Sequence, residues 1–314
     1  MSGVRSDPHP VSLSSSPSAV PPVLNLPADH LLCGRYRLTI AGEKFHPLVM
    51  GILNVTPDSF SDGGQFASLE MAITRAEQMI ADGVDIIDIG GESTRPGAAP
   101  VSVDQELERI MPVVYALRDC GKPLSVDTRR PEVMREVIQA GVDMINDVEG
   151  FRADGTLGLL SDSDCALCIM HMQGQPQTMQ HTPHYDDVVS EVGAFLAERV
   201  AAAEGLGIDR RRLCIDPGFG FGKNLSHNLT LLNRLAELQS AVGLPVLAGL
   251  SRKSMIGMLT GRGAEQRLAG SIGAALAAVM QGAQIVRVHD VAETVDAIKV
   301  WQAAVSPQRP DIKN

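Results

Sequence analysis

Three basic side chains in the last third of the chain could bind an anion such as a phosphate or a diphosphate. Lys253 lies in the stretch GLSRKS, and Arg287 and His289 lie two residues apart in VRVHD. Asn54 and Ser251 could add uncharged hydrogen-bonding groups to the same site. The formal net charge of −10 argues against nucleic acid or an anionic membrane as a partner. It still permits a small anionic ligand, because a few local cations can outweigh the global charge.

A second set of side chains combines carboxylates with an amide. Asp127, Asn146 and Asp216 offer several hydrogen-bond acceptors and amide donors at fixed positions. This combination suits the N–H and C=O edge of a flat heterocycle, such as a pterin or a purine. Two longer stretches, 55–67 and 91–102, are rich in Gly, Ser, Thr and Pro. They could close over a ligand and exclude water.

Each of these side chains stands within or just after a short apolar run that resembles a buried strand. Amphipathic stretches typical of helices separate the runs, and glycine follows most of them at the position of a C-terminal cap. The expected strands are LVMGILN (48–54), DIIDIG (85–90), PLSVD (123–127), DMIND (143–147), ALCIMHM (166–172), LCIDP (213–217), PVLAGLS (245–251) and QIVRVHD (284–290).

Eight strands that alternate with helices predict an α/β fold, namely a (β/α)8 TIM barrel. The competing architecture is a doubly wound open sheet, which usually has fewer strands and a glycine-rich fingerprint after the first strand. In a barrel all carboxyl ends of the strands meet at one mouth, where active sites are built. Helix N-capping explains some Asp, Asn and Ser residues at strand ends, but not Lys253, Arg287 and His289. We therefore expect the basic and acidic groups to share one site.

The remaining composition indicates how the chain is organised. Residues 1–30 are rich in Ser and Pro and lack a hydrophobic signal core, so we predict a flexible extension there and one barrel domain over 31–314. No apolar run approaches the roughly 18 residues that a membrane span requires. The five cysteines are an odd number and fit reduced thiols. These features favour a cytoplasmic protein.

Three motifs with other possible functions do not fit their usual contexts. GFGFGK (218–223) resembles a phosphate-binding loop, but Pro replaces its first Gly and Asn follows its Lys. Cys165 and Cys168 have the C-x-x-C spacing, but positions i and i+3 of a strand face opposite sides, and no second pair completes a zinc site. His171, His181 and His184 lack a spacing that supports joint metal ligation. We expect the two cysteines to be small buried core residues.

Eight stretches together resemble the dihydropteroate synthase family, the folate-pathway enzymes that sulfonamides inhibit. The resemblance covers about residues 35–305, in the order of the family, and leaves out the Ser/Pro-rich start. The stretches are GILNVTPDSFSDGG, DIGGESTRPGA, SVDTRRPEVMREVIQAG, MINDVEG, MHMQGQPQTMQ, DPGFGFGKN, GLSRKSMIG and VRVHDV.

The resemblance implies a pterin-binding TIM barrel, a transferase that usually forms a homodimer. It implies the condensation of 6-hydroxymethyl-7,8-dihydropterin diphosphate with 4-aminobenzoate, which gives 7,8-dihydropteroate and pyrophosphate and requires Mg2+. The stretches 55–67 and 91–102 would be the family's two mobile loops.

The resemblance also implies roles for individual positions. The pterin-binding set is Asp127, Asn146, Met172, Asp216, Gly249 and Lys253. The diphosphate-binding set is Asn54, Thr94, Arg287 and His289, and Asn54 is also the expected metal contact. The aminobenzoate pocket would comprise Phe60, Thr94, Pro96, Phe221 and Ser254. The expected catalytic residues are Asn54, Arg95, Asp127 and Lys253.

A dissociative mechanism fits these groups. The dihydropterin ring can delocalise positive charge at the CH2 carbon, and Asp127 and Asp216 would stabilise that charge. Lys253, Arg287, His289 and Mg2+ would stabilise the departing diphosphate. The aryl amine is a weak base, so it needs positioning more than deprotonation.

Two other functions fit parts of the sequence. A pterin-binding methyltransferase that uses methyltetrahydrofolate and a corrinoid would share the barrel and the Asp/Asn pterin edge. It would have no use for a diphosphate site, so residues 54–64 and 251–254 count against it. A catalytically silent paralogue could keep the fold as a binding protein, but the complete set of ionisable residues argues against such a loss.

Overall fold

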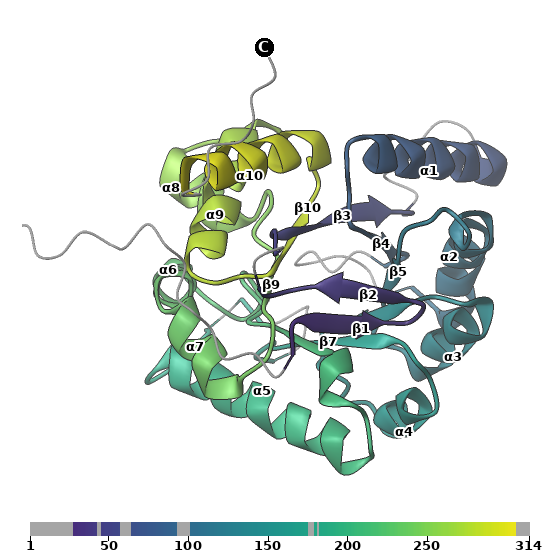
Figure 1. The fold of residues 1–314 in the computed structure, drawn as a ribbon, viewed down its shortest axis with the longest axis horizontal. Coiled ribbons are helices and arrows are strands. Elements are labelled where there is room, and N and C mark those ends of the chain that lie inside the picture. Colours follow the sequence, from purple (N-terminus) through teal and green to yellow (C-terminus); the bar gives the residue numbers. More distant parts are fainter. Residues whose placement is uncertain are drawn as a thin grey trace, which may run out of the picture.

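The fold is a barrel of parallel strands surrounded by helices (Figure 1). The computed structural model describes residues 28–42, 45–56, 64–92, 101–174, 179–180 and 182–305, with the backbone alone over 64–67. The N-terminal extension expected over 1–30 lies outside these residues, except for its last three positions. No helix in the described part of the chain is long and apolar enough to cross a membrane.

Eight strands form the barrel, in the order β8-β7-β6-β5-β4-β3-β10-β9. A parallel bridge between Ile215 of β8 and Val246, just before β9, closes the sheet on itself. The predicted TIM barrel is therefore confirmed, and each expected strand overlaps an observed one. The strands are β3 (Leu48–Asn54), β4 (Ile86–Gly90), β5 (Leu124–Asp127), β6 (Met144–Asp147), β7 (Ala166–Met170), β8 (Leu213–Asp216), β9 (Leu247–Ala248) and β10 (Ile285–Val288).

The helices form the outer layer and begin and end at recognisable signals. The Ser102 and Gln105 side chains cap the start of α2 reciprocally, and Pro131 opens α3, which ends at the left-handed Gly141. The helices are α1 (Gly64–Ala81), α2 (Val103–Leu117), α3 (Pro131–Ala140), α4 (Thr156–Ser161), α5 (Val188–Gly205), α6 (Leu225–Asn233), α7 (Leu235–Val242), α8 (Ser254–Thr260), α9 (Leu268–Met280) and α10 (Val291–Val305). Two short 3-10 helices cover Arg210–Arg212 and Ala264–Gln266.

Both faces of the strands are buried, which is why they are continuous apolar runs in the sequence. One apolar cluster lies between the barrel and the helices, and a second fills the barrel interior. Cys165 belongs to the first cluster and Cys168 to the second, and both are free thiols. The expectation that these cysteines are separate core residues is confirmed.

A hairpin of β1 (His30–Cys33) and β2 (Tyr36–Thr39) lies at the amino-terminal ends of the barrel strands (Figure 1). Its apolar side chains join the interior cluster, and Arg35 pairs with Asp143, the residue before β6, at 3.0 Å. This hairpin was not predicted. It covers the end of the barrel opposite the carboxyl ends of the strands.

Candidate active site

The structure brings Asp88, Asp127 and Arg287 into direct contact at the mouth of the barrel. Arg287 Nε lies 2.6 Å from Asp88 Oδ2, and Arg287 Nη2 lies 2.7 Å from Asp127 Oδ2. Asp88 is fully buried, on β4 between the strands that carry the other two residues. Two carboxylates thus share one guanidinium, and the cluster has a local excess of negative charge when both are ionised.

The environment of Asp127 acts on its protonation in opposite directions. Burial raises the pKa of this carboxyl above its usual range, and the neighbouring Asp88 adds to the increase. The Arg287 guanidinium opposes both effects and favours the ionised form of Asp127. A positively charged ligand at the mouth would act in the same direction as Arg287 and stabilise the carboxylate further.

Asn146 extends this cluster along the next strand, β6. Its side-chain nitrogen lies 3.5 Å from Asp88 Oδ2. Within the described part of the chain, Asn146 Oδ1 and Asp88 Oδ1 are buried acceptors without a hydrogen-bond partner. Buried acceptors of this kind normally find a donor, so this part of the mouth suits the N–H groups of a ligand.

The Asp216 carboxylate and the Lys253 ammonium converge around Gly249. A methyl group in place of its hydrogen would lie 3.7 Å from Asp216 Oδ2 and 3.9 Å from Lys253 Nζ. Glycine therefore leaves open the space between the two charged groups. Burial raises the pKa of Asp216, although the Lys253 ammonium opposes this increase. Burial lowers the pKa of Lys253 to about 8, and Asp216 counteracts this decrease.

Lys253 is oriented by the loop that follows β8. Its ammonium donates a hydrogen bond to the carbonyl of Phe219 and lies 4.6 Å from the centre of the Phe221 ring. Met172 is buried in a small apolar cluster that packs against Phe221. Ser254 follows directly as an exposed residue at the start of α8. These residues give the site an apolar wall beside its charged groups.

The outer rim of the mouth holds His289 and Asn54. The Ser251 hydroxyl lies 3.0 Å from His289 Nδ1 and accepts a hydrogen bond from the backbone N–H of His289 at 3.3 Å. These two contacts fix His289 just after the carboxyl end of β10. Asn54 ends the neighbouring strand β3 and is half-buried, with its side-chain oxygen next to Gly90. Phe60, Thr94, Arg95 and Pro96 lie outside the described residues.

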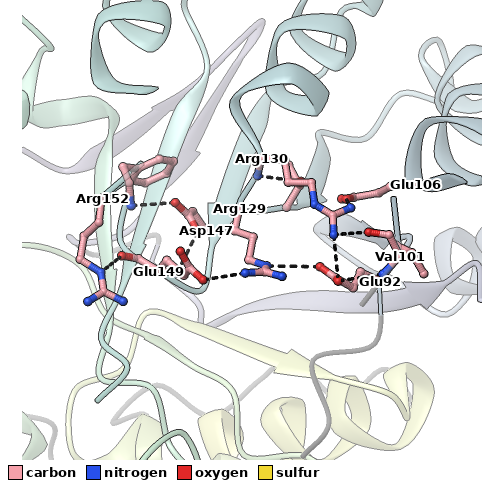
Figure 2. Close-up of polar contacts among 10 residues, drawn as sticks. Glu92, Val101, Glu106, Arg129, Arg130, Asp147, Glu149 and Arg152 are labelled. Atoms are coloured by element: carbon pink, nitrogen blue, oxygen red, sulfur yellow. Dashed lines mark hydrogen bonds and ion pairs between the residues drawn. The ribbon is translucent and has the colours of Figure 1, made fainter. Parts of the chain in front are cut away.

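A network of ion pairs at the ends of β4, β5 and β6 has no counterpart in the site predicted from sequence (Figure 2). Arg130 lies 3.1 Å from Glu92 and 2.7 Å from Glu106, and it also donates to the carbonyl of Val101. Arg129 forms two ion pairs, one with Glu92 at 3.3 Å and one with Glu149 at 2.9 Å. Arg130 therefore links Glu92 and Val101, the two described residues that flank the segment 93–100.

The sequence contained the arginine pair in SVDTRRPEV, but nothing in the spacing of Arg129 and Arg130 indicates these partners.

Asp147, which follows Asn146, likewise has a structural role. Its two carboxylate oxygens accept the backbone N–H groups of Glu149 and Phe151 at 2.8 and 2.7 Å. Burial raises the pKa of Asp147 to about 7, and these two bonds oppose the increase.

Comparison with known proteins agrees with the geometry of the mouth. Residues 50–289 match the family model described as pterin binding enzyme. Dihydropteroate synthase of Escherichia coli (strain K12) is 54% identical over 262 residues, which are 83% of this chain and 93% of that protein.

Two solved structures are similarly close. The Xanthomonas albilineans dihydropteroate synthase with 4-aminobenzoic acid has 52% identity and a TM-score of 0.82, over 89% of this chain and 99% of the other. The Burkholderia cenocepacia dihydropteroate synthase complexed with 7,8-dihydropteroate has 50% identity and a TM-score of 0.80, over 89% and 97% of the two chains. The chain belongs to the pterin-binding enzyme family and, within it, to the dihydropteroate synthases.

Proposed function

We propose that the mouth of this barrel condenses 6-hydroxymethyl-7,8-dihydropterin diphosphate with 4-aminobenzoate to give 7,8-dihydropteroate and pyrophosphate. The observation that carries the proposal is the convergence of the Asp88–Arg287–Asp127 cluster with Asp216 and Lys253 at one end of the barrel. The relatives with bound 4-aminobenzoic acid and with bound 7,8-dihydropteroate support this substrate and this product.

The pterin ring would lie among Asp127, Asn146, Asp216 and Lys253. Unpartnered acceptors on Asp88 and Asn146 suit the N–H groups of the ring, and the Lys253 ammonium suits a ring carbonyl or nitrogen. Gly249 would leave room for the ring, and Met172 would pack against it.

The diphosphate would bind at the rim to Asn54, Arg287, His289 and Thr94. Asn54 fits a role as a magnesium contact, because an amide oxygen is a hard ligand and Mg2+ usually takes few protein ligands together with phosphates and water. Bound Mg2+ would neutralise negative charge on the diphosphate.

The aminobenzoate pocket would form between the apolar wall and the segments that close the mouth. Phe221 and Ser254 would contribute from the described residues, and Phe60, Thr94, Arg95 and Pro96 from the loops after β3 and β4. Arg130 binds Glu92 and the carbonyl of Val101, the two residues that flank the segment 93–100.

The substitution at the pterin CH2 would be dissociative, so the bond to the diphosphate oxygen breaks before the bond to the amine nitrogen forms. The ring delocalises the positive charge, and Asp127 and Asp216 stabilise it across short distances in a largely buried site. Arg287, His289 and Lys253 hold the departing diphosphate. The amine is positioned for attack and loses its proton after the new bond has formed, without a strong general base.

The protein would act as a homodimer in the cytoplasm. Five free cysteines are compatible with a reducing compartment. The neighbouring helices α8, α9 and α10 expose large apolar side chains, among them Met258, Leu259 and Val300, and such a surface suits a second copy of the chain. A molar mass of one chain by light scattering at micromolar concentration would contradict the dimer.

The reaction itself is tested by the release of pyrophosphate in the presence of Mg2+. We expect release only when both the pterin diphosphate and 4-aminobenzoate are present, with 7,8-dihydropteroate formed in equal amount. Release without 4-aminobenzoate, or none with both substrates at saturation, would overturn the proposed function.

A further inference from the structure

The loop GFGFGK contains a buried lysine that has no role in the reaction described above. Lys223 is only 3% exposed. Its Nζ donates to the carbonyls of Gly218 and Phe221, both at 3.0 Å, and lies 2.9 Å from His171 Nδ1. The two carbonyls, together with His171 Nδ1 in its unprotonated form, would satisfy the three hydrogens of an ammonium group. None of them is a carboxylate, and a buried charge without an ion-pair partner is costly. Burial accordingly lowers the pKa of Lys223 to about 7, although the Asp216 carboxylate opposes this decrease.

The glycines of the loop allow its carbonyls to converge on this ammonium. Gly218 and Gly222 have φ angles of 68° and 59°, which side chains other than glycine rarely adopt. A Cβ at Gly218 would lie 1.9 Å from the His171 carbonyl oxygen, and one at Gly222 would lie 2.6 Å from the carbonyl oxygen of Gln173. The alternating glycines therefore serve close packing of the loop against the strand exit of β7, rather than phosphate binding.

The same loop provides the surface that orients Lys253. The Phe219 carbonyl accepts from Lys253, and the Phe221 ring lies beneath it. Asp216, two residues before Gly218, accepts the N–H of Gly218 at 2.7 Å. The shape of the loop thus sets the positions of two groups proposed to bind the pterin.

We propose that Lys223 is a positioning residue that holds the turn 218–222 in the shape required to orient Lys253. The imidazole of His171 accepts from Lys223 through Nδ1, so the ring is neutral and carries its proton on Nε2. Burial lowers the pKa of His171 to about 2, and the nearby Lys223 contributes to the decrease, in agreement with a neutral ring. This role rests on the proposed function, because it assumes that the pterin ring binds beside Asp216 and Lys253.

The experiment compares Lys223→Met, which removes the ammonium and keeps most of the side-chain length, with Lys299→Met, which removes an exposed lysine on α10. Binding of two probes is measured by calorimetry. The first is 6-hydroxymethylpterin, which contains the ring alone, and the second is inorganic pyrophosphate with Mg2+.

For Lys223→Met we expect a loss of roughly 10- to 100-fold in affinity for the pterin and a smaller loss for pyrophosphate, because Arg287 and His289 would still hold the diphosphate without Lys253. Lys299→Met should bind both probes as the wild type does. Wild-type pterin affinity in Lys223→Met, or an equal loss for both probes, would overturn the positioning role. Failure of the wild type to bind the pterin would instead contradict the proposed function.

A measurement on the wild-type protein tests the same geometry without a variant. The 15N resonances of the His171 ring should correspond to the neutral tautomer protonated on Nε2. A ring protonated on Nδ1 could not accept from Lys223 and would contradict the proposed contact.

Discussion

The Asp88–Arg287–Asp127 cluster explains how one site can handle a cation and an anion. Arg287 divides its guanidinium between two carboxylates, at 2.6 and 2.7 Å, so it neutralises only one of them. The remaining negative charge faces the proposed pterin, while the guanidinium itself lies next to the proposed diphosphate site. A developing positive charge on the pterin is then stabilised by groups that are already in position.

Replacing Asp127 by Asn should weaken catalysis strongly and leave the fold intact, because Arg287 keeps its pair with Asp88. We expect a loss of about 3 kcal/mol in transition-state stabilisation, or roughly 100-fold in kcat/KM for the pterin diphosphate. Asp119→Asn, at an exposed site on the opposite end of the barrel, is the matched control. Near-normal turnover of Asp127→Asn would refute the electrostatic role.

The protonation of Lys253 should set the alkaline limit of activity. Its pKa is lowered to about 8 by burial, so the free enzyme loses this positive charge as the pH rises through that value. We expect kcat/KM for the pterin diphosphate to fall above about pH 8. In Lys253→Arg this decrease in kcat/KM should begin at a higher pH, because a guanidinium group stays protonated. A rate that stays constant well above pH 8 in the wild type would contradict this assignment.

At the scale of elements, Arg129 and Arg130 connect the exits of three adjacent strands (Figure 2). Arg130 is a largely buried residue between Glu92 and Glu106, and Glu106 is almost inaccessible to solvent. Gly91 permits this arrangement, because a Cβ there would lie 2.7 Å from an atom of Ile110 on α2. The chain just after β4 is therefore held in two ways: Gly91 packs against α2, and Glu92 pairs with Arg130.

Arg130→Met should destabilise the protein, because it leaves the Glu106 carboxylate buried without its partner. We expect a loss of about 3 kcal/mol in the free energy of unfolding, measured in urea, and a higher KM for 4-aminobenzoate. The control is Arg211→Met, which breaks an exposed pair with Asp209 and should cost less than about 1 kcal/mol. Equal stability of the two variants would show that the Arg130 ion pairs do not anchor the chain at Glu92 and Val101.

At the scale of the whole molecule, most of the barrel could be predicted from the sequence. Parallel strands buried on both faces are apolar runs, so every barrel strand was found, and both predicted ends of β3, Leu48 and Asn54, were correct. The run 245–251 was predicted too long, because the strand covers only Leu247–Ala248, preceded by the bridge at Val246, and the chain then turns to bring Lys253 to the mouth. The hairpin of β1 and β2 was missed, since its eight strand residues alternate too briefly to indicate what they cover.

The site was predictable to the extent that strand ends must meet in a barrel. That rule places Asp127, Asn146, Asp216 and Arg287 at one mouth before any coordinates are known. It does not say which groups pair, so the contacts of Asp88 with Arg287 and of Arg130 with Glu106 appeared only in three dimensions. Lys223 was missed for a related reason, because its partners are backbone carbonyls whose directions depend on the glycine conformations of the loop.

The central claim is that the mouth stabilises positive charge on the pterin before the amine attacks. The most direct test is the secondary deuterium isotope effect at the pterin CH2, measured in single turnovers, which report the chemical step. A dissociative reaction converts this carbon to a planar centre, so we predict a clearly normal effect. An effect near unity would show that the bond to the amine is well advanced when the diphosphate leaves, and would contradict the account.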